Sequence, residues 1–400
     1  MPNVTTHKGF HVPNDKYFEY SEKAVERALE SGQINFDDIS LIKEFIGEIS
    51  MNIAPERVYK LHYILINWRN FIKPYRENTA ADLFSGMEKI KRFQKKDGKY
   101  YSKNTLGDYV KFLKRFYLWM SDNEYTNIPE KKIKKFKIPK PPQMSVTAEE
   151  LLSEEDILKM IDACWNSRDR ALISMLYEGA FRIGELGNLQ WKQIKFNSWN
   201  TVVNVDSKTD RPRYIPLLIA KPYIAQWKND YPFEPEGDNH VFLSFNDNEP
   251  IQYRGMQKKI LKIAEKAGIT KKIHPHLFRH SRITHLIQKG YSESCIKKMG
   301  WGNLTTNMFS TYAHLTDSDI DNEIAKQEGI ITEDKPEHSP LEARQCPRCY
   351  TINGPTMNFC GSCGLELTPE ALAEKKELMD NLHNLNKEQL LDLVQKALTG

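Results

Sequence analysis

Six residues, spread over four short segments, are of types that bind an anion or take part in proton transfer. In chain order they are Arg182, Lys208, His276 with Arg279, and Trp301 with Tyr312. Arginine is always charged, and its planar guanidinium donates two parallel hydrogen bonds to one anion. Glycines flank Arg182 and would let the backbone approach a ligand closely. His276 and Arg279 are three residues apart and therefore share one face of a predicted helix.

Each of these residues alone also has an ordinary structural explanation. An arginine with a glutamate nearby, such as Arg182, usually forms a salt bridge, and a lysine in a turn, such as Lys208, is usually solvated. A tyrosine near a helix end, such as Tyr312, is more often half-buried core than a reactive group. The neighbouring histidines are expected to be structural or anion-facing donors; they are His274, His280, His285 and His314. Only the combination and the order of the six residues indicate a site.

Four of the six cysteines form two C-x-x-C pairs near the end of the chain. The pairs are Cys346 with Cys349 and Cys360 with Cys363, and ten residues separate them. Four thiolates at this spacing are typical of a tetrahedral zinc site in a ribbon, although a redox pair or two disulfides are alternatives. Because protein would fill all four positions, we expect a structural zinc rather than a catalytic one. Cys164 and Cys295 lie in helical patterns and are expected to be buried or idle thiols.

Basic residues are concentrated in two blocks far apart in the sequence. Residues 87–140 contain 16 Lys and Arg against 6 Asp and Glu, and residues 251–300 contain 12 against 2. Residues 316–344 are instead acidic, with 3 against 9. Two basic blocks indicate that two parts of the chain face one polyanion. Lysine-rich helices that only solvate their outer faces would give the same pattern.

Length and composition restrict the class of protein. A chain of 400 residues is too long for one core and predicts two or three domains. Hydrophobic residues make up 40% and charged residues 28%, which predicts a folded chain. There is no apolar run of 18 residues and no signal-peptide core at the start. We therefore expect a cytoplasmic protein without a membrane span.

Changes in periodicity and composition divide the chain into seven segments. They are a loose leader (1–20), an all-helical domain (21–138), a proline-containing linker (139–150), a mainly helical domain with a small β-sheet (151–331), an acidic linker (332–344), the cysteine ribbon (345–368) and an amphipathic helix (369–400). The acidic linker, flanked by prolines, is expected to let the ribbon fold independently. The apolar stripe of the last helix predicts either self-association or packing back on the preceding domain.

The hydrophobic periodicity predicts the elements that must position the six residues. Helices are expected over 41–49, 58–68, 79–95 and 103–120 in the first domain, and over 153–164, 168–178, 182–189, 252–268, 276–289, 293–299 and 304–313 in the second. Ser153 and Asp156 form a capping signature at the start of one of these helices. Two β-like runs, 201–205 and 213–217, predict a hairpin whose turn contains Lys208.

Taken together and in this order, the six residues resemble those of the tyrosine recombinases, the family of integrases and Xer-type site-specific recombinases. The resemblance covers about residues 21–316. It implies a multidomain fold, with an all-α, SAM-like N-terminal domain that binds core DNA and a mainly α catalytic domain with a small β-sheet. The zinc ribbon and its helix lie outside the common pattern of this family. The ribbon is similar to tails of some archaeal proteins, which indicates an archaeal source.

The resemblance implies that Tyr312 attacks the scissile phosphodiester and forms a 3′-phosphotyrosyl link. Arg182 and Arg279 would clamp the non-bridging oxygens of the phosphate. Elementary chemistry agrees, because the transition state gathers negative charge on these oxygens and arginines are suited to hold it. With two such clamps, no catalytic metal is required, and the domain has no Asp and Glu cluster of metal-ligand type.

The remaining residues would move protons. The resemblance implies that Lys208 protonates the leaving 5′-oxygen and that His276 assists proton transfer. A free phenol has a pKa near 10, so only about one in a thousand is ionised at pH 7 and Tyr312 needs a base, for which His276 is the candidate. Trp301 stands where many members carry a second histidine. Tryptophan donates one hydrogen bond but transfers no proton, so Trp301 can only orient phosphate or pack the nucleophile's helix.

The function that the resemblance implies is site-specific DNA recombination or integration. A covalent intermediate conserves the bond energy, so no ATP is needed, and the chain has no G-x-x-x-x-G-K-[ST] nucleotide motif. Double-stranded DNA would lie between the two main domains of a dimer or tetramer, in a nucleoid-associated location. Alternatives are type IB topoisomerase-like nicking and resealing, or a catalytically inactive DNA-binding regulator on the same fold. The complete set of residues argues against the regulator.

Overall fold

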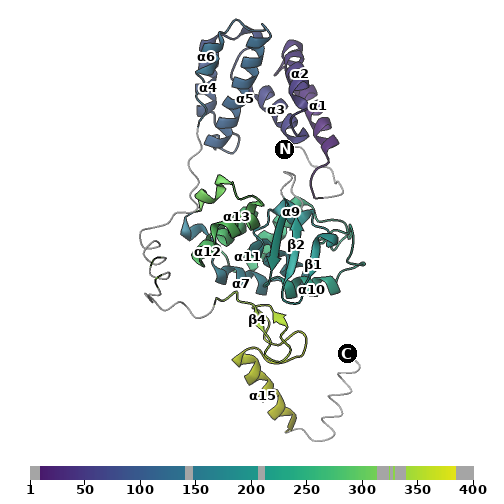
Figure 1. Ribbon diagram of the computed structural model, residues 1–400. Helices are drawn as coiled ribbons and strands as arrows, with labels where there is room; N and C mark the ends of the chain where they lie inside the picture. The colour runs from purple at the N-terminus through teal and green to yellow at the C-terminus, as the bar shows by residue number, and fades with distance from the viewer. Residues whose placement is uncertain are drawn as a thin grey trace. The chain divides into compact units, whose positions relative to one another are not determined.

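The computed structural model describes residues 10–139, 147–205, 212–312, 324, 328 and 339–383 (Figure 1). The chain divides into two units. The described part of the first unit is residues 12–139, and the second unit contains residues 10–11 and the described residues from 147 onward. Within these described residues, no helix combines the length and the apolar character that crossing a membrane requires.

The first unit is helical. Its α-helices are α1 (Asn14–Glu30), α2 (Phe36–Ser50), α3 (Pro55–Trp68), α4 (Ala80–Arg92), α5 (Lys103–Asp122) and α6 (Glu130–Lys134). Capping boxes begin α2, through Asn35, and α4, through Thr79, and each satisfies backbone N–H groups that the helix itself leaves free. Aromatic side chains fill the core, among them the completely buried Trp68 and Phe116. The predicted helices at 41–49, 58–68, 79–95 and 103–120 are all present.

The first helix starts earlier than the sequence predicts. Residues 1–20 show no clear period, yet α1 begins at Asn14 and packs along α3. Its buried residues are few, with Val25 and Ala28 joining a small cluster that includes Ile66 of α3. No residue of α1 before Ser21 is buried, so its first turns show no apolar period in the sequence.

The second unit contains a three-stranded antiparallel sheet and helices around it. The strands are β1 (Ile194–Phe196), β2 (Thr201–Val205) and β3 (Arg213–Leu217), in the order β1-β2-β3. The helices are α7 (Glu154–Asp162), α8 (Ser167–Glu178), α9 (Ile183–Gly187), α10 (Lys221–Asn229), α11 (Tyr253–Lys266), α12 (Pro275–Gln288) and α13 (Glu293–Trp301). Val205 pairs with Arg213, so the predicted hairpin is confirmed. Strand β1 and helix α10 were not predicted, and the helix predicted at 304–313 is a 3-10 helix, Asn307–Thr311.

A buried carboxylate fixes the end of α8 against the end of β3. Glu178 accepts hydrogen bonds from the backbone N–H groups of Leu218 (2.7 Å), Ile219 (3.0 Å) and Ala220 (2.8 Å). Burial raises the pKa of Glu178, although Arg282 and these three donors act against the rise. Glu178 is the last residue of α8, so this contact anchors the loop that leads to Arg182.

The C-terminal part of the described chain is docked on the second unit. It contains β4 (Arg344–Gln345), which pairs with β5 (Ile352–Asn353), and the helix α15 (Pro369–His383). Leu341 is buried in the core of the second unit, and Thr356 donates or accepts a hydrogen bond at 2.6 Å with Tyr223 of α10. A Cβ on Gly354 would lie 2.6 Å from the Tyr223 ring, so the contact is close. The ribbon therefore packs on the second unit, and its independent folding stays a prediction.

Candidate active site

A single glutamate joins two arginines at the start of α9. Arg182 immediately precedes this helix, and its guanidinium Nη1 donates to Glu185 Oε1 at 2.7 Å. The other oxygen of Glu185 accepts from the backbone N–H of Arg182 (2.7 Å) and from Arg213 Nη1. Burial alone would raise the pKa of Glu185, but Arg213 and Arg182 lower it below its ordinary value. Glu185 is therefore ionised at neutral pH.

Arg182 and Arg213 differ in exposure, and this difference gives them different roles. The side chain of Arg182 is 43% exposed, so its guanidinium can meet a ligand. The side chain of Arg213, the first residue of β3, is 1% exposed. Arg213 also donates to the backbone carbonyls of Met299 (2.7 Å) and Gly179 (3.1 Å), so it ties β3 to α13 and to the loop before Arg182.

The loop between α8 and α9 directs two carbonyl groups at arginines. Ala180 has a φ of +46°, in the left-handed region that a residue with a Cβ seldom adopts. The Gly179 carbonyl accepts from Arg213, and the Ala180 carbonyl accepts from Arg279 Nη1 at 2.6 Å. These hydrogen bonds stabilise the strained turn, which in turn places Arg182.

Arg279 is the buried arginine of α12. It is 4% exposed, and its Nη2 donates to the Gly300 carbonyl at 2.7 Å. Its guanidinium lies over the Trp301 ring, 5.0 Å from the ring centroid. Burial, with the nearby positive charges of Arg213 and Arg182, lowers the pKa of Arg279 to about 9. The group is still charged at pH 7, because the negative charge of Glu185 offsets these effects in part.

Tyr312 lies between two aromatic rings. The His280 ring is 5.3 Å from it and the Trp301 ring is 5.9 Å from it, measured between centroids. Burial raises the pKa of the Tyr312 phenol, while the charges of Arg279 and Arg182 lower it in part. Because the net shift is upward, the phenol is protonated at neutral pH and needs a base to become a nucleophile.

The histidines of α12 are neutral at pH 7. Burial, then the charges of Arg279 and of His274, lowers the pKa of His276 below its ordinary value. Burial, with His276 and His274 nearby, lowers the pKa of His280 to about 4. A neutral imidazole can accept a proton, so His276, on which Arg279, Arg182 and Glu185 all act electrostatically, has the state that a base requires.

The structure brings together five of the six residues that the sequence singles out. Arg182, His276, Arg279, Trp301 and Tyr312 are linked by the contacts and electrostatic effects given above. Lys208 and His314 lie outside the described residues.

Sequence reasoning missed two residues of the site, Glu185 and Arg213, and named His280 only as a structural or anion-facing donor. Glu185 stands three residues after Arg182, a spacing that places both on one helix face. An arginine as the first residue of a β-like run was a further signal, because a charged residue there needs a buried partner.

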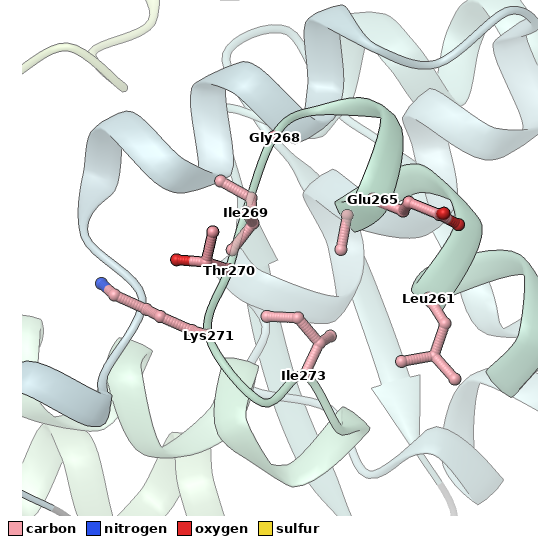
Figure 2. Close-up of a pocket in the computed structure, with 8 residues that line it drawn as sticks. Leu261, Glu265, Gly268, Ile269, Thr270, Lys271 and Ile273 are labelled. Atoms are coloured by element: carbon pink, nitrogen blue, oxygen red, sulfur yellow. The ribbon is translucent and has the colours of Figure 1, made fainter.

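Two surface pockets lie elsewhere on the second unit. One, of about 340 Å³, lies around the loop after α11 and is lined by Leu261, Ala264, Glu265, Gly268, Ile269, Thr270, Lys271 and Ile273 (Figure 2). Another, of about 250 Å³, lies where the ribbon meets α10 and includes Tyr223 and Thr356. None of the six residues lines either pocket, so neither pocket contributes to the site.

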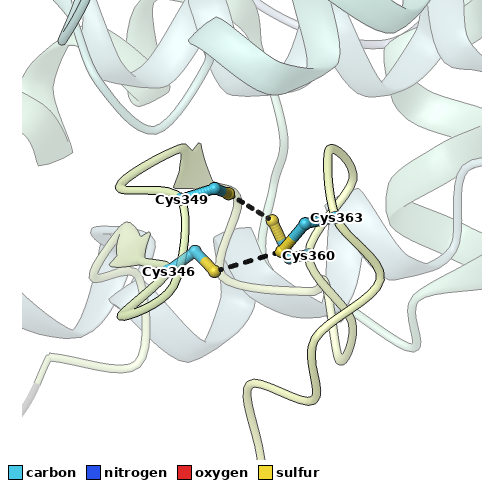
Figure 3. A group of neighbouring side chains, drawn as sticks. All are labelled: Cys346, Cys349, Cys360 and Cys363. Carbon is cyan, nitrogen blue, oxygen red and sulfur yellow. Dashed lines mark hydrogen bonds between the residues drawn. The ribbon is translucent and has the colours of Figure 1, made fainter.

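The four ribbon cysteines gather into one group (Figure 3). Their sulfur atoms all lie within 4.8 Å of one another; Cys346 and Cys363 are 3.6 Å apart, and Cys349 and Cys360 are 3.5 Å apart. Tetrahedral zinc with Zn–S bonds of about 2.3 Å requires sulfurs about 3.8 Å apart, so the group fits this metal. A disulfide would need about 2.05 Å.

The backbone of the ribbon supports the same arrangement. The residue after each pair, Tyr350 with φ +58° and Gly364 with φ +69°, has a left-handed conformation. Its N–H donates back to the carbonyl of the first cysteine, from Tyr350 to Cys346 and from Gly364 to Cys360, each at 2.9 Å. Both C-x-x-C pairs therefore form the same turn, and each turn directs its two sulfur atoms toward one point.

Comparison with known proteins shows a family likeness within the second unit. Residues 150–319 match the model of the phage integrase family, a match that covers less than half of the chain. The matched residues contain α7 to α13, the sheet and the six residues that the sequence singles out.

The similarity to curated proteins is partial. Transposase A from transposon Tn554 of Staphylococcus aureus is 28% identical over 191 residues, which are 44% of this chain and 51% of the transposase. The tyrosine recombinase XerC of Yersinia pestis is 32% identical over 151 residues, which are 37% of this chain and 48% of XerC. The chain thus spans about half the length of the curated relatives it matches.

Solved structures show the same fold over a larger part of the chain. Lambda integrase bound to DNA matches with a TM-score of 0.54 at 12% identity, over 70% of this chain and 98% of that structure. XerH recombinase bound to a palindromic difH substrate matches with a TM-score of 0.52 at 16% identity, over 80% of this chain and all of XerH. At these identities the likeness concerns the fold alone.

Proposed function

We propose that this chain is a site-specific DNA recombinase or integrase that cleaves and rejoins strands through a 3′-phosphotyrosyl link to Tyr312. One observation carries the proposal: the Tyr312 ring contacts the Trp301 ring, over which the Arg279 guanidinium lies, and Arg182, whose charge also acts on the phenol, is exposed. A phosphodiester held by these guanidiniums would meet the phenol. The family of the second unit supports the same reaction.

Cleavage begins with the transfer of the phenolic proton. The raised pKa of Tyr312 makes the free phenol a weak nucleophile, and neutral His276 is the candidate base. The phenolate oxygen forms a bond to phosphorus, and the bond from phosphorus to the 5′-oxygen breaks. Lys208 is proposed to give its proton to that oxygen. Because the phosphotyrosyl bond conserves the energy of the broken bond, rejoining needs no ATP.

The arginines stabilise the charge that develops in this step. Arg279 is preorganised, since the Ala180 and Gly300 carbonyls hold two of its nitrogens. Arg182 is oriented by Glu185 but remains open to the ligand. Trp301 transfers no proton; its ring covers the Arg279 guanidinium and contacts the ring of Tyr312, so it positions both.

Basic residues of both units are proposed to grip double-stranded DNA. Ile133 and Phe136 anchor the α6 region by burial, while the lysines around them are exposed; these are Lys131, Lys132, Lys134, Lys135 and Lys137. In the second unit, α11 exposes Arg254, Lys258, Lys262 and Lys266. Such residues bind phosphates without reading sequence. Strand exchange requires two sites, so we propose a dimer or tetramer on DNA, in a cytoplasmic, nucleoid-associated location.

The ribbon is proposed to hold one structural zinc, because its four sulfurs have the spacing of a tetrahedral site. In this proposal, zinc takes no part in the reaction. It would hold the two C-x-x-C turns in place and so stabilise the contact between Thr356 and Tyr223. The ribbon and α15 are proposed to serve assembly. The source of the chain is proposed to be archaeal.

The experiment that tests the function is covalent trapping. The full chain is incubated with nicked duplexes of randomised sequence, labelled at the 5′ end of the nicked strand, and the products are separated under denaturing conditions. We expect a labelled protein–DNA adduct with the wild type and none with Tyr312→Phe, although the variant still binds the duplexes. An adduct that persists in Tyr312→Phe would refute the assignment of the nucleophile. Relaxation of plasmids without exchange between two recovered sites would indicate a topoisomerase instead.

A further inference from the structure

A phenylalanine from the start of the chain is built into the core of the second unit. Phe10 is 2% exposed and belongs to the main hydrophobic cluster of that unit. Its carbonyl accepts a hydrogen bond of 3.2 Å from the N–H of Tyr253, the first residue of α11, which has no partner within its own helix. The two rings meet edge to face, 5.8 Å apart. A loose leader was predicted for residues 1–20, which include Phe10.

Phe10 and His11 lie on a glycine face of α9. Gly184 and Gly187 are three residues apart and share one side of this short helix. A Cβ at Gly187 would overlap the Phe10 ring, and a Cβ at Gly184 would lie 2.9 Å from His11 Nε2. The absence of side chains at these two positions is what lets the segment approach the helix backbone.

Helix α9 carries the exposed arginine of the site at its beginning. It has five residues, too few to be stable without tertiary contacts, and it follows Arg182 directly. Glu185 in its first turn holds the Arg182 guanidinium. One side of α9 is fixed through the buried Ile183 and Leu186, and the glycine side is fixed by Phe10. Loss of Phe10 would free that side and change the direction of Arg182.

We propose that Phe10 is a positioning residue for Arg182, which it holds through α9. The inference rests on the proposed function, because it concerns the same site. Phe10 and His11 belong to the second unit, and the described residues of the helical unit begin at Val12.

The test is a double-mutant cycle in the full chain. Gly187→Ala places a methyl group against the Phe10 ring, Phe10→Ala removes the ring, and the double variant has room for the new methyl group. The matched control is Gly255→Ala in α11, where a Cβ would meet only Ile251 at an ordinary 3.5 Å. The rate of adduct formation at saturating DNA, the affinity for the same nicked duplexes and thermal unfolding are measured for each.

We expect Gly187→Ala to slow adduct formation on the order of tenfold to a hundredfold, the scale for misplacing a group near the chemistry. DNA affinity should change little, because Arg182 is one of many phosphate contacts. Phe10→Ala should slow the reaction less, Phe10→Leu less again, and the double variant should be faster than Gly187→Ala. A wild-type rate for Gly187→Ala, or a double variant no faster than Gly187→Ala, would overturn the inference.

A second measurement separates this inference from the proposed function. Amide hydrogen exchange over residues 183–188 reports how firmly α9 is held, and it requires no cleavage. Faster exchange in Phe10→Ala supports the contact even if no variant forms an adduct, in which case only the proposed function fails. Unchanged exchange overturns the role of Phe10 whatever the cleavage assay shows.

Discussion

Replacement of the buried Arg213 by alanine should destabilise the second unit strongly. The substitution leaves the Met299 and Gly179 carbonyls without their donor and removes one of the two guanidiniums bound to the Glu185 carboxylate. Breaking a buried ion pair from one side costs about 3–5 kcal/mol. Because the exposed Arg182 still holds Glu185, we expect the lower end of that range, about 3 kcal/mol.

The measurement is urea unfolding of the full chain, followed by hydrogen exchange in peptides from residues 147–312. This readout isolates the second unit, since a chain of two units has no single unfolding free energy. The matched control is Lys192→Ala, which removes an ion pair with Asp238 whose side chains are both more than half exposed; the expected cost is below about 1 kcal/mol. Arg213→Lys keeps the charge but lacks the planar guanidinium, so its loss of stability should lie between those of Arg213→Ala and Lys192→Ala. An Arg213→Ala variant as stable as the Lys192→Ala control would refute the reasoning.

Three further predictions concern charge, pH and metal. Arg182→Ala and Arg279→Ala should each slow adduct formation on the order of a hundredfold in single-turnover assays, but only Arg279→Ala should also lower thermal stability, since its donors hold two carbonyls. The rate of cleavage should fall as the pH decreases through the lowered pKa of His276, because the base becomes protonated. His276→Ala should remove this pH dependence. His280, with a pKa of about 4, should not take over as the base. Removal of zinc by a strong chelator should release one equivalent and increase hydrogen exchange in α10, and Tyr223→Phe should weaken this coupling.

The sequence predicts most of the site because the chemistry restricts the residue types. Arginines and a tyrosine cannot be replaced by similar residues without losing charge or nucleophile, so their order along the chain carries information. The hairpin and the helix from Pro275 were also predictable, the first from β-branched runs and the second from a proline at its first turn. The helices of the first unit were predictable because aliphatic residues recur there at spacings of three and four residues.

The contacts that position these residues could not be predicted in this way. Phe10 lies in a segment without a period, and its partner face is defined by two glycines more than 170 positions later. The docking of Thr356 on Tyr223 likewise depends on one hydroxyl pair rather than on a pattern. The acidic linker predicted at 332–344 indicates that the ribbon is separate from the preceding domain. Composition contains no information on whether the ribbon and that domain come into contact in the folded chain.

The electrostatic balance of the site connects these contacts to function. The guanidiniums of Arg182 and Arg213 bind the Glu185 carboxylate, and their positive charges contribute, after burial, to the lowered pKa of Arg279. Burying such an excess of positive charge costs stability, which the hydrogen bonds that the arginines donate to the Gly179, Ala180 and Gly300 carbonyls only partly offset. A bound phosphodiester would supply the missing negative charge, and the pKa of Arg279 should then rise toward its ordinary value. The free site is therefore the less stable state, and this difference favours binding an anion beside Tyr312 rather than any neutral ligand.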